Sequence, residues 1–326
     1  MCHTPKYTQK HYGRAQWTQK KGKKMRFRGQ VTNVALFLRL CGALCKIEKT
    51  CVLQLAPKAV RFVLTTAVSD GMELWAGMGI NTLFDNVIID SLAEDKSITL
   101  KIALDSLEKA LKSGQAAQRF VAKLKKRDGC PVLSFVAEVQ TPYALTVCQD
   151  VPVTVLPSSF MRGVAEPTLP NPDVYIFLPQ VKVLRNVVEH MKNVADNVTL
   201  SANMCGEFSV GVDTNTVAIV TTFSGLQHPD IALNPSAVSS GTSTSTPSSS
   251  SSSESTGSNP TTPMVAVPRD RQARAKVNIT KMYRFLQCYL VQPHNVICCI
   301  VEGRSVVFHA ILDDLYLTYY LPVIIS

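Results

Sequence analysis

The sequence predicts an α+β fold in which helices cover one face of antiparallel sheets. Two observations lead to this prediction. The order strand, helix, three strands occurs four times along the chain, and strand patterns outnumber helical ones. A chain of 326 residues also has room for about two domains of ~150 residues. We therefore expect two similar domains, each built from two strand-helix-three-strand units with the helices on the same face.

The first two units are predicted from alternation of apolar residues in the strands and from apolar residues at helical spacing in the helices. The first unit has strand 26–32, helix 33–47 and strands 51–57, 60–66 and 72–77, with a further strand at 83–90. The second unit has strand 97–103, helix 104–115 and strands 119–126, 131–139 and 143–156.

The last two units carry start signals for their helices. Pro179 is expected to open the third helix, where its missing amide costs little, and Thr280 is expected to cap the fourth. The third unit has strand 173–178, helix 179–195 and strands 198–204, 207–213 and 217–223. The fourth unit has strand 275–279, helix 280–290 and strands 295–301, 305–312 and 315–323.

Changes in composition mark the expected domain boundaries. We expect a disordered basic tail at 1–24, an N-terminal domain at 25–156, a Pro-rich connector at 157–172 and a C-terminal domain at 173–326. A Ser-rich stretch at about 234–268 has nothing with which to bury apolar area, so we expect a disordered insertion there.

The basic tail accounts for most of the net charge. Residues 1–24 contain six Lys, one Arg and no acidic residue, so they hold +7 of the formal +10. The global charge therefore does not by itself argue for nucleic-acid binding. Two interpretations of the tail stay open. It carries a nuclear address in "KKGKK", or it is an extension before a natural start at Met25, where a strand pattern begins at once.

The residue pattern argues against an enzyme, a metal site and a membrane protein. The ten cysteines form no Cys-x-x-Cys pair, and the sequence has no nucleotide-binding glycine loop and no nucleophile elbow. No apolar run approaches the length of about 18 residues needed to cross a membrane, and no secretory signal pattern occurs. We expect no catalytic residue, no metal and no cofactor, and reduced cysteines that act as small apolar residues.

Each predicted helix pairs an apolar seam with a small basic face. One basic pair is usually a solvated helix face, but four pairs in equivalent places of a repeated architecture lie on the same side of the molecule. Lys and Arg without a base-reading motif suit contact with phosphates, which positions a protein on DNA without specifying sequence. The residues expected to face DNA are Arg39, Lys46, Lys109, Lys112, Lys182, Arg185, Lys192, Lys281 and Arg284.

A second group of cations follows the strand after the second helix. Alternation points Val121 inward, and Lys123, Lys125, Lys126 and Arg127 run to the far end of this strand. The pattern leaves open whether these cations contact nucleic acid or only keep the protein soluble.

The order of the elements resembles that of the sliding DNA clamps, and the residues narrow the resemblance to the Hus-one subunit of the nine-one-one checkpoint clamp. It runs from Met25 to about Leu321 and is interrupted by the Ser-rich insertion. The motifs that carry it are "MRFR" at 25–28, "KTCVLQLAP" at 49–57, "LEKALKSGQAA" at 107–117, "QDVPVTVLP" at 149–157, "EPTLPNPDVYIFLP" at 166–179, "VVEHMKNVADNVTLSANMCGEFSV" at 187–210 and "LDDLYLTYYLPVI" at 312–324.

This resemblance implies a sliding-clamp fold like that of proliferating cell nuclear antigen. It also implies a non-enzymatic subunit of a heterotrimeric ring that encircles DNA and acts in damage checkpoint signalling and repair. The implied partners are Rad-nine-like and Rad-one-like subunits, a checkpoint clamp loader and DNA without sequence specificity, with no membrane. The implied location is the nucleus, with a cytoplasmic pool as an alternative. Subunits of such rings join edge strand to edge strand, here through Ala144, Leu145, Val147, Val217, Ile219, Val220 and Thr221.

The chain departs from the family pattern in its basic tail, its insertion and His190, where a Lys is commoner. At His190 the chain therefore lacks a Lys that the resemblance implies for DNA contact. Three alternatives stay open: a paralogous form of the same subunit, a homotrimeric replication clamp, and an interaction scaffold that never touches DNA. A homotrimer purified alone would elute as a ring, whereas a nine-one-one subunit would stay monomeric or aggregate.

Overall fold

The computed structural model describes residues 25–65, 71–140, 143–164, 166–167, 171–229 and 270–325. The predicted tail at 1–24 and the predicted insertion at 234–268 lie outside these ranges. The described chain is built mainly of antiparallel strands with a few helices, as the sequence predicts.

The N-terminal half places one long helix after its first strand and a second after its sixth. Asn33 starts the first of these helices, because its side-chain oxygen accepts a hydrogen bond from the amide of Leu36 at 3.0 Å. The strands are β1 (Arg26–Val31), β2 (Thr50–Leu55), β3 (Ala59–Thr65), β4 (Glu73–Gly79), β5 (Phe84–Asp90), β6 (Ile98–Ala103), β7 (Arg119–Arg127), β8 (Cys130–Gln140) and β9 (Ala144–Leu156). The helices are α1 (Val34–Ile47), α2 (Ile80–Leu83) and α3 (Leu104–Lys112).

The C-terminal half follows the same order after a connecting segment that contains the short helix α4 (Phe160–Gly163). Its strands are β10 (Val174–Phe177), β11 (Asn197–Ala202), β12 (Phe208–Asp213), β13 (Ala218–Phe223), β14 (Ala273–Asn278), β15 (Asn295–Val301), β16 (Ser305–Leu312) and β17 (Leu315–Pro322). Its helices are α5 (Val181–Met191) and α6 (Ile279–Phe285), and α6 continues as the 3₁₀ helix η1 (Leu286–Val291).

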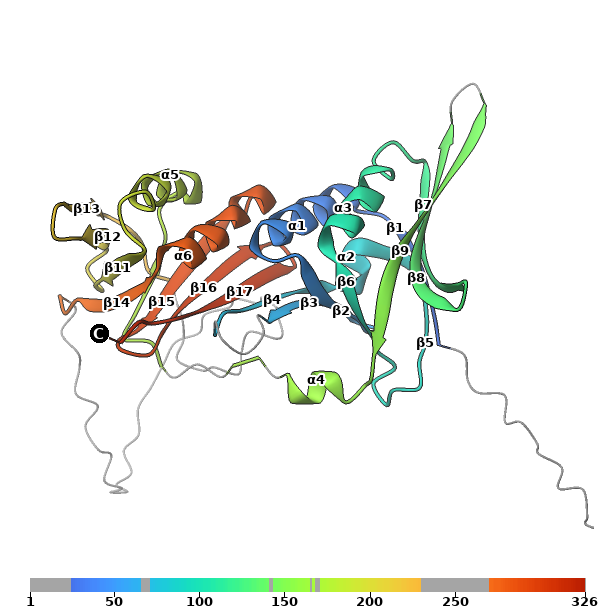
Figure 1. Ribbon diagram of the computed structural model, residues 1–326, viewed down its shortest axis with the longest axis horizontal. Coiled ribbons are helices and arrows are strands. Elements are labelled where there is room, and N and C mark those ends of the chain that lie inside the picture. The colour runs from blue at the N-terminus through green and yellow to red at the C-terminus, as the bar shows by residue number, and fades with distance from the viewer. Residues whose placement is uncertain are drawn as a thin grey trace, which may run out of the picture.

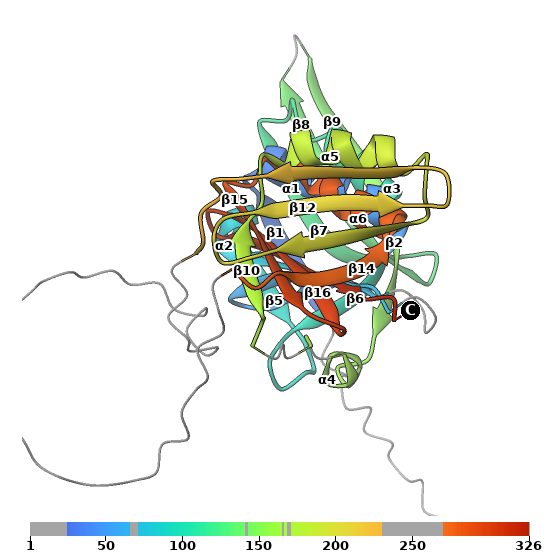
Figure 2. The same ribbon diagram turned by 90° about the vertical axis from the view of Figure 1, so that its left-hand side faces the viewer.

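The strands form two sheets. Thirteen of them make one sheet in the order β10-β15-β16-β17-β4-β3-β2-β6-β9-β8-β7-β1-β5, and four make a second in the order β13-β12-β11-β14. The large sheet runs through both halves of the chain because β17 pairs with β4, with Thr318 opposite Trp75. Figure 2 shows the end of the molecule where the small sheet lies, with β13 as the gold strand along the upper edge of this sheet.

The long helices lie together on one side of the sheets. Figure 1 shows them in the order α5, α6, α1 and α3 along that side. Helix α1 packs against both α3 and η1, and α5 packs against α6 and η1. Their inward side chains, such as Leu40, Leu107 and Phe285, are buried in one core that extends through both halves. Burial of this seam fixes which helix face is left for solvent.

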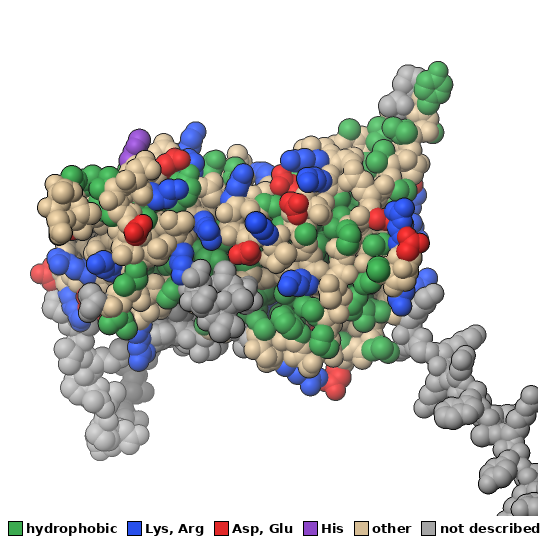
Figure 3. All heavy atoms as spheres, in the orientation of Figure 1, with side chains coloured by type: hydrophobic (Ala, Val, Ile, Leu, Met, Phe, Trp, Pro, Cys, Tyr) green, Lys and Arg blue, Asp and Glu red, His purple; other side chains and the backbone are tan. Residues whose placement is uncertain are grey.

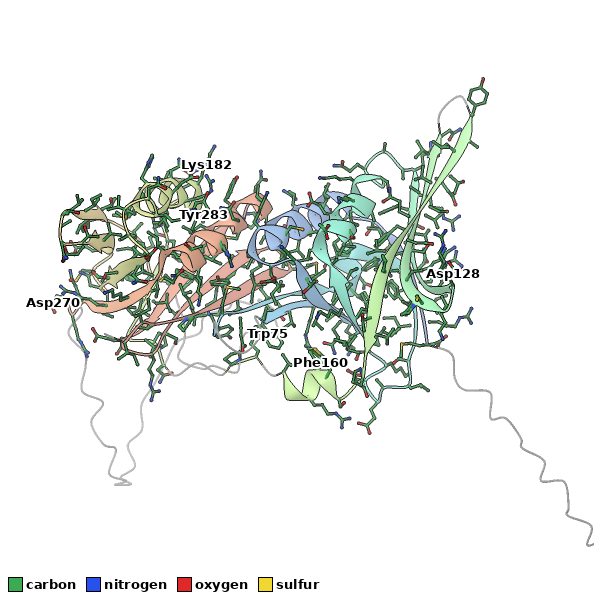
Figure 4. All side chains as sticks on the ribbon, in the orientation of Figure 1. Trp75, Asp128, Phe160, Lys182, Asp270 and Tyr283 are labelled. Atoms are coloured by element: carbon green, nitrogen blue, oxygen red, sulfur yellow. The ribbon has the colours of Figure 1, made fainter. Side chains whose placement is uncertain are left out.

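The opposite side of the large sheet carries a smaller apolar cluster beneath the connecting segment. Val52, Trp75 and Val307 belong to this cluster, and Phe160 of α4 packs against it. Figure 4 shows Trp75 and Phe160 on the side away from Lys182 and Tyr283, which belong to the helix layer. The described part of the connecting segment around α4 therefore covers part of the outer face of the sheet. Across the described ranges, no helix is long and apolar enough to span a membrane.

The structure corrects the expected ends of the last two long helices. Pro179 precedes the first helical residue, Val181, by two positions, because Gln180 occupies the N-cap. Thr280 lies inside α6, and the cap is Asn278, whose side chain accepts a hydrogen bond from the amide of Lys281 at 3.1 Å. The predicted helix over 179–195 ends at Met191, and the one-turn helices α2 and α4 were not predicted, because a single turn leaves no periodic pattern.

Candidate nucleic-acid interface and edge strands

The helix layer exposes a row of cations on the side away from the sheets. Arg39 and Lys46 of α1, Lys109 and Lys112 of α3, and Lys182 of α5 are all exposed. Arg185, Lys192, Lys281 and Arg284 are half-buried. Figure 3 shows Lys and Arg side chains spread across the upper side of the molecule, where Figure 1 places the helices. The four basic pairs therefore lie on one side of the fold.

The cations of α3 are paired with acids of the same helix. The ammonium of Lys109 lies 3.8 Å from the carboxylate of Asp105, and that of Lys112 lies 2.9 Å from Glu108. Both pairs join residues one turn apart on a helix surface, a type worth only a few tenths of a kcal/mol (~0.3–0.5), and only Glu108 among the four residues is half-buried. Because each pair is neutral and weak, α3 adds little net potential, while its ammonium groups stay free to exchange partners with a phosphate.

Arg185 is held inside a cluster between α5 and the next helix and is not a free cation. Its Nη2 donates a hydrogen bond to the hydroxyl of Tyr283 at 2.7 Å and lies 3.4 Å from the carboxylate of Glu189. The Tyr283 hydroxyl in turn donates to Glu189 at 2.9 Å. The guanidinium carbon lies 5.2 Å from the ring centre of Tyr283 and 5.3 Å from that of Tyr289. Figure 4 places Tyr283 next to α5, the helix that carries Lys182.

This cluster joins α5 to α6 and η1. Only 21% of the Arg185 side chain is exposed, and its charge is already balanced by Glu189. The ammonium of Lys192 also sits 4.6 Å from the ring centre of Tyr283, a distance typical of a cation–π contact. Tyr283 and Tyr289 were not singled out by sequence reasoning, because their role depends on how two helices far apart in the chain pack together.

Arg39 bridges the two halves of the chain. Its Nη1 donates a hydrogen bond to the side-chain oxygen of Gln292 at 3.1 Å, and Gln292 follows η1 with a left-handed backbone at φ 58°. The contact is exposed. Arg39 therefore lies where the helices of the two halves meet, and Figure 1 shows its helix, α1, between α6 and α3.

The strand β13 is an edge strand of the described small sheet, and some of its apolar side chains are exposed to solvent. It pairs with β12, with Val210 opposite Thr221 and Val212 opposite Ile219, and no strand of the described chain pairs with its other side. Val220 is 69% exposed and Ile219 36% exposed. Val217 lies just outside the strand, in a turn where its amide donates to the Thr214 hydroxyl.

The strand β9 offers a second edge at the other end of the molecule. Its first part pairs with β8, from Gln140 opposite Ala144 to Val132 opposite Pro152, and its last residues pair with β6. The second side of the first part is unpaired within the described ranges. Leu145 is 51% exposed there, whereas Val147 packs partly into the core. Figure 1 shows β9 and β13 at opposite ends of the fold.

The described residues hold no group of three or more His, Cys, Asp or Glu side chains arranged to bind a metal ion. The cysteines of the core are buried thiols: burial raises the pKa of Cys288 to about 12 and that of Cys299 to about 12. Burial, together with Glu108, also raises the pKa of Cys45 to about 12. These thiols stay protonated near neutral pH and serve as small apolar side chains.

Solved structures with this fold are sliding clamps. The proliferating cellular nuclear antigen of Entamoeba histolytica matches with a TM-score of 0.64 and 13% identity, over 92% of this chain and 99% of that one. PCNA from Thermococcus kodakaraensis matches with a TM-score of 0.61 and 12% identity, over 91% of this chain and 100% of that one. At these identities the likeness establishes the fold, and it confirms the predicted sliding-clamp architecture.

Sequence relatives are checkpoint proteins. The Checkpoint protein hus1 homolog of Dictyostelium discoideum is 30% identical over 93% of this chain and all of the relative. Checkpoint protein HUS1 of Homo sapiens is 28% identical over 91% of this chain and 99% of the relative, and Checkpoint protein hus1 of Schizosaccharomyces pombe is 30% identical over 91% and 98%. The model of the family described as Hus1-like protein matches residues 25–325. The chain belongs to the Hus1-like protein family.

Proposed function

We propose that the chain is the Hus-one subunit of a heterotrimeric checkpoint clamp, a ring that encircles DNA and acts in damage signalling and repair. The geometry that carries this proposal is one cation-bearing helix layer with an unpaired, apolar edge strand at each end. Membership of the Hus1-like family and the clamp fold support the same function. A homotrimeric replication clamp uses the same fold, and the checkpoint names of the relatives favour the heterotrimer.

The edges β9 and β13 would join the neighbouring subunits by main-chain hydrogen bonds from strand to strand. Exposed apolar residues such as Leu145 and Val220 would be buried in these contacts. The neighbours would be Rad-nine-like and Rad-one-like subunits, and a checkpoint clamp loader would open the ring around DNA. We assign the ring no catalytic activity and a nuclear location.

The exposed cations of the helix layer would contact phosphates along the DNA. Lys46, Lys109, Lys112 and Lys182 are the side chains best placed for this role, with Arg39 at the junction of the two halves. Arg185 and Lys192 are assigned to the cluster around Tyr283 and fix the position of α5. Binding through phosphates alone would be independent of sequence and sensitive to salt.

Co-expression with the two partner subunits tests the assignment. We expect one complex that contains each subunit once, seen by native mass spectrometry, whereas the chain purified alone forms no closed ring. A stable trimer of this chain alone would favour the homotrimeric clamp. Failure to bind either partner would overturn the proposal.

A further inference from the structure

The outer face of β1 and β7 carries a group of five cations that the proposed DNA contact does not use. Phe27 of β1, and Phe120 and Ala122 of β7, are buried against the helices. Because neighbouring side chains of a strand alternate between faces, the residues between them point away from the helices. Five of the outward cations lie together and are called here the outer basic cluster: Arg26, Arg28, Lys123, Lys125 and Arg127. Arg119, at the other end of β7, lies 3.7 Å from Glu138 and is not counted among them.

The register of the sheet places two of these cations side by side. Arg28 lies directly opposite Lys123 in the pairing of β1 with β7. Two residues further along each strand, Arg26 and Lys125 continue the row. Like charges directly opposite each other destabilise a sheet. The ion pairs of the described residues include none for Arg26, Arg28 or Lys123, and the acid nearest by register is Asp90, opposite Arg26. The pair of Arg28 and Lys123 therefore adds no favourable charge interaction to the folded sheet.

One carboxylate forms ion pairs with the last two cations of the cluster, Lys125 and Arg127. Asp150 of β9 lies 3.0 Å from the ammonium of Lys125 and 3.0 Å from Nη1 of Arg127, and only 12% of its side chain is exposed. Its position under the two cations fixes them on the surface. The exposed Asp128 of the β7–β8 turn lies 3.9 Å from Arg127 and leaves Arg28 and Lys123 untouched. Figure 4 marks Asp128 at the right-hand end of the molecule, where Figure 1 places β7 and β8.

The spacing of the cluster matches an extended peptide. Outward residues of one strand recur every second residue, about 7 Å apart, and the side chains on one face of an extended peptide have the same repeat. We propose that the outer basic cluster docks an extended acidic segment of a partner protein, with Asp or Glu at alternate positions. Charge complementarity carries the proposal, and it goes beyond the proposed ring and its DNA contact.

The test measures binding of a fluorescein-labelled decapeptide of alternating Glu and Thr to the full chain, by fluorescence anisotropy at low ionic strength. We expect the double variant R28E/K123E to bind at least about tenfold more weakly than the unmodified chain, because two attractions become repulsions. A second variant, R28Q/K123Q, relieves the like-charge contact. It should fold at least as well as the unmodified chain and also lose affinity.

The matched control is R274E/K276E. These two exposed cations stand two residues apart on β14, between buried Ala273, Ala275 and Val277, and have no cation opposite them on the neighbouring strand. This variant should bind the peptide as the unmodified chain does. Equal losses of peptide affinity in R28E/K123E and R274E/K276E would show only a general charge effect and would overturn the proposal. Unchanged peptide binding in R28Q/K123Q would also overturn it. If R28E/K123E instead loses affinity for a short DNA duplex and keeps the peptide, the cluster is a nucleic-acid surface and the proposal is wrong.

Discussion

The hydroxyl of Tyr283 should be a main source of stability where α5 meets α6. Replacing Tyr283 by Phe removes the acceptor for Arg185 at 2.7 Å and the donor to Glu189 at 2.9 Å. A hydrogen bond to a charged group contributes about 1.5–3 kcal/mol. Two factors lower the total here: Arg185 keeps its contact with Glu189 at 3.4 Å, and Glu189 is 46% exposed and regains water. We therefore expect Y283F to reduce the free energy of unfolding by about 2 kcal/mol.

Urea unfolding of the purified chain, followed by circular dichroism, measures this change. The matched control is Y289F: the ring of Tyr289 lies as close to Arg185, but its hydroxyl makes no hydrogen bond to any residue that the structure describes. We expect Y289F to change stability by less than about 0.5 kcal/mol. A double-mutant cycle of Y283F with E189Q should give a coupling of about 1 kcal/mol, since the two side chains share one hydrogen bond. Equal and small effects of Y283F and Y289F would refute the assigned role of this hydroxyl.

Three further predictions concern an edge, a turn and a carboxylate. Val220→Lys should change the free energy of unfolding by less than about 0.5 kcal/mol, because the side chain is 69% exposed, and should weaken co-purification with the partner subunits. Co-purification of an intact complex would argue against β13 as a joining edge. Gly206→Ala should lower the free energy of unfolding in urea by about 2–3 kcal/mol, since the φ of Gly206 is +91° and a Cβ would stand 2.6 Å from the carbonyl oxygen of Leu226. An unchanged free energy of unfolding would contradict this geometry. The hydroxyl of Ser134, directly opposite on β8, and the cations of β7 hold the pKa of Asp150 below its ordinary value, so the stabilising effect of this carboxylate is present above a pH of about 4 and is lost as pH falls through the lower folded pKa. The stability difference between the unmodified chain and D150N should therefore shrink in acid, and a difference that does not change with pH would exclude the mechanism.

The sequence predicted the helices and strands whose own residues show a clear apolar periodicity. In α3, Leu104, Leu107 and Leu111 recur at helical spacing, and all three are fully buried. The strands alternate clearly enough that each expected strand has a counterpart in the structure, with ends that differ by a few residues. The four repeated units follow from this order, because each helix must cover the strands next to it.

Features that depend on packing between distant segments left no such signal. Arg185 reads as an exposed helix cation at the level of sequence, and only the packing of α5 against α6 and η1 brings it between Tyr283 and Tyr289. The pairing of β4 with β17, which joins the two halves into one sheet, is likewise absent from any local pattern. The strand cations left undecided by the sequence divide by register, with Lys123, Lys125 and Arg127 on the outer face. The predicted inward direction of Val121 is wrong, because Phe120 and Ala122 occupy the inward positions and Val121 shares the outer face with these cations.

The salt dependence of DNA binding by the assembled three-subunit complex tests whether the helix layer faces DNA. The unmodified complex is compared with one in which the exposed Lys46, Lys109, Lys112 and Lys182 are changed to Ala. Each lost phosphate contact lowers the magnitude of the slope of log K against log salt by about 0.9, so we expect a slope smaller by about 3–4 and weaker binding at low salt. The same affinity and the same slope in both complexes would contradict the claim that the helix layer faces DNA.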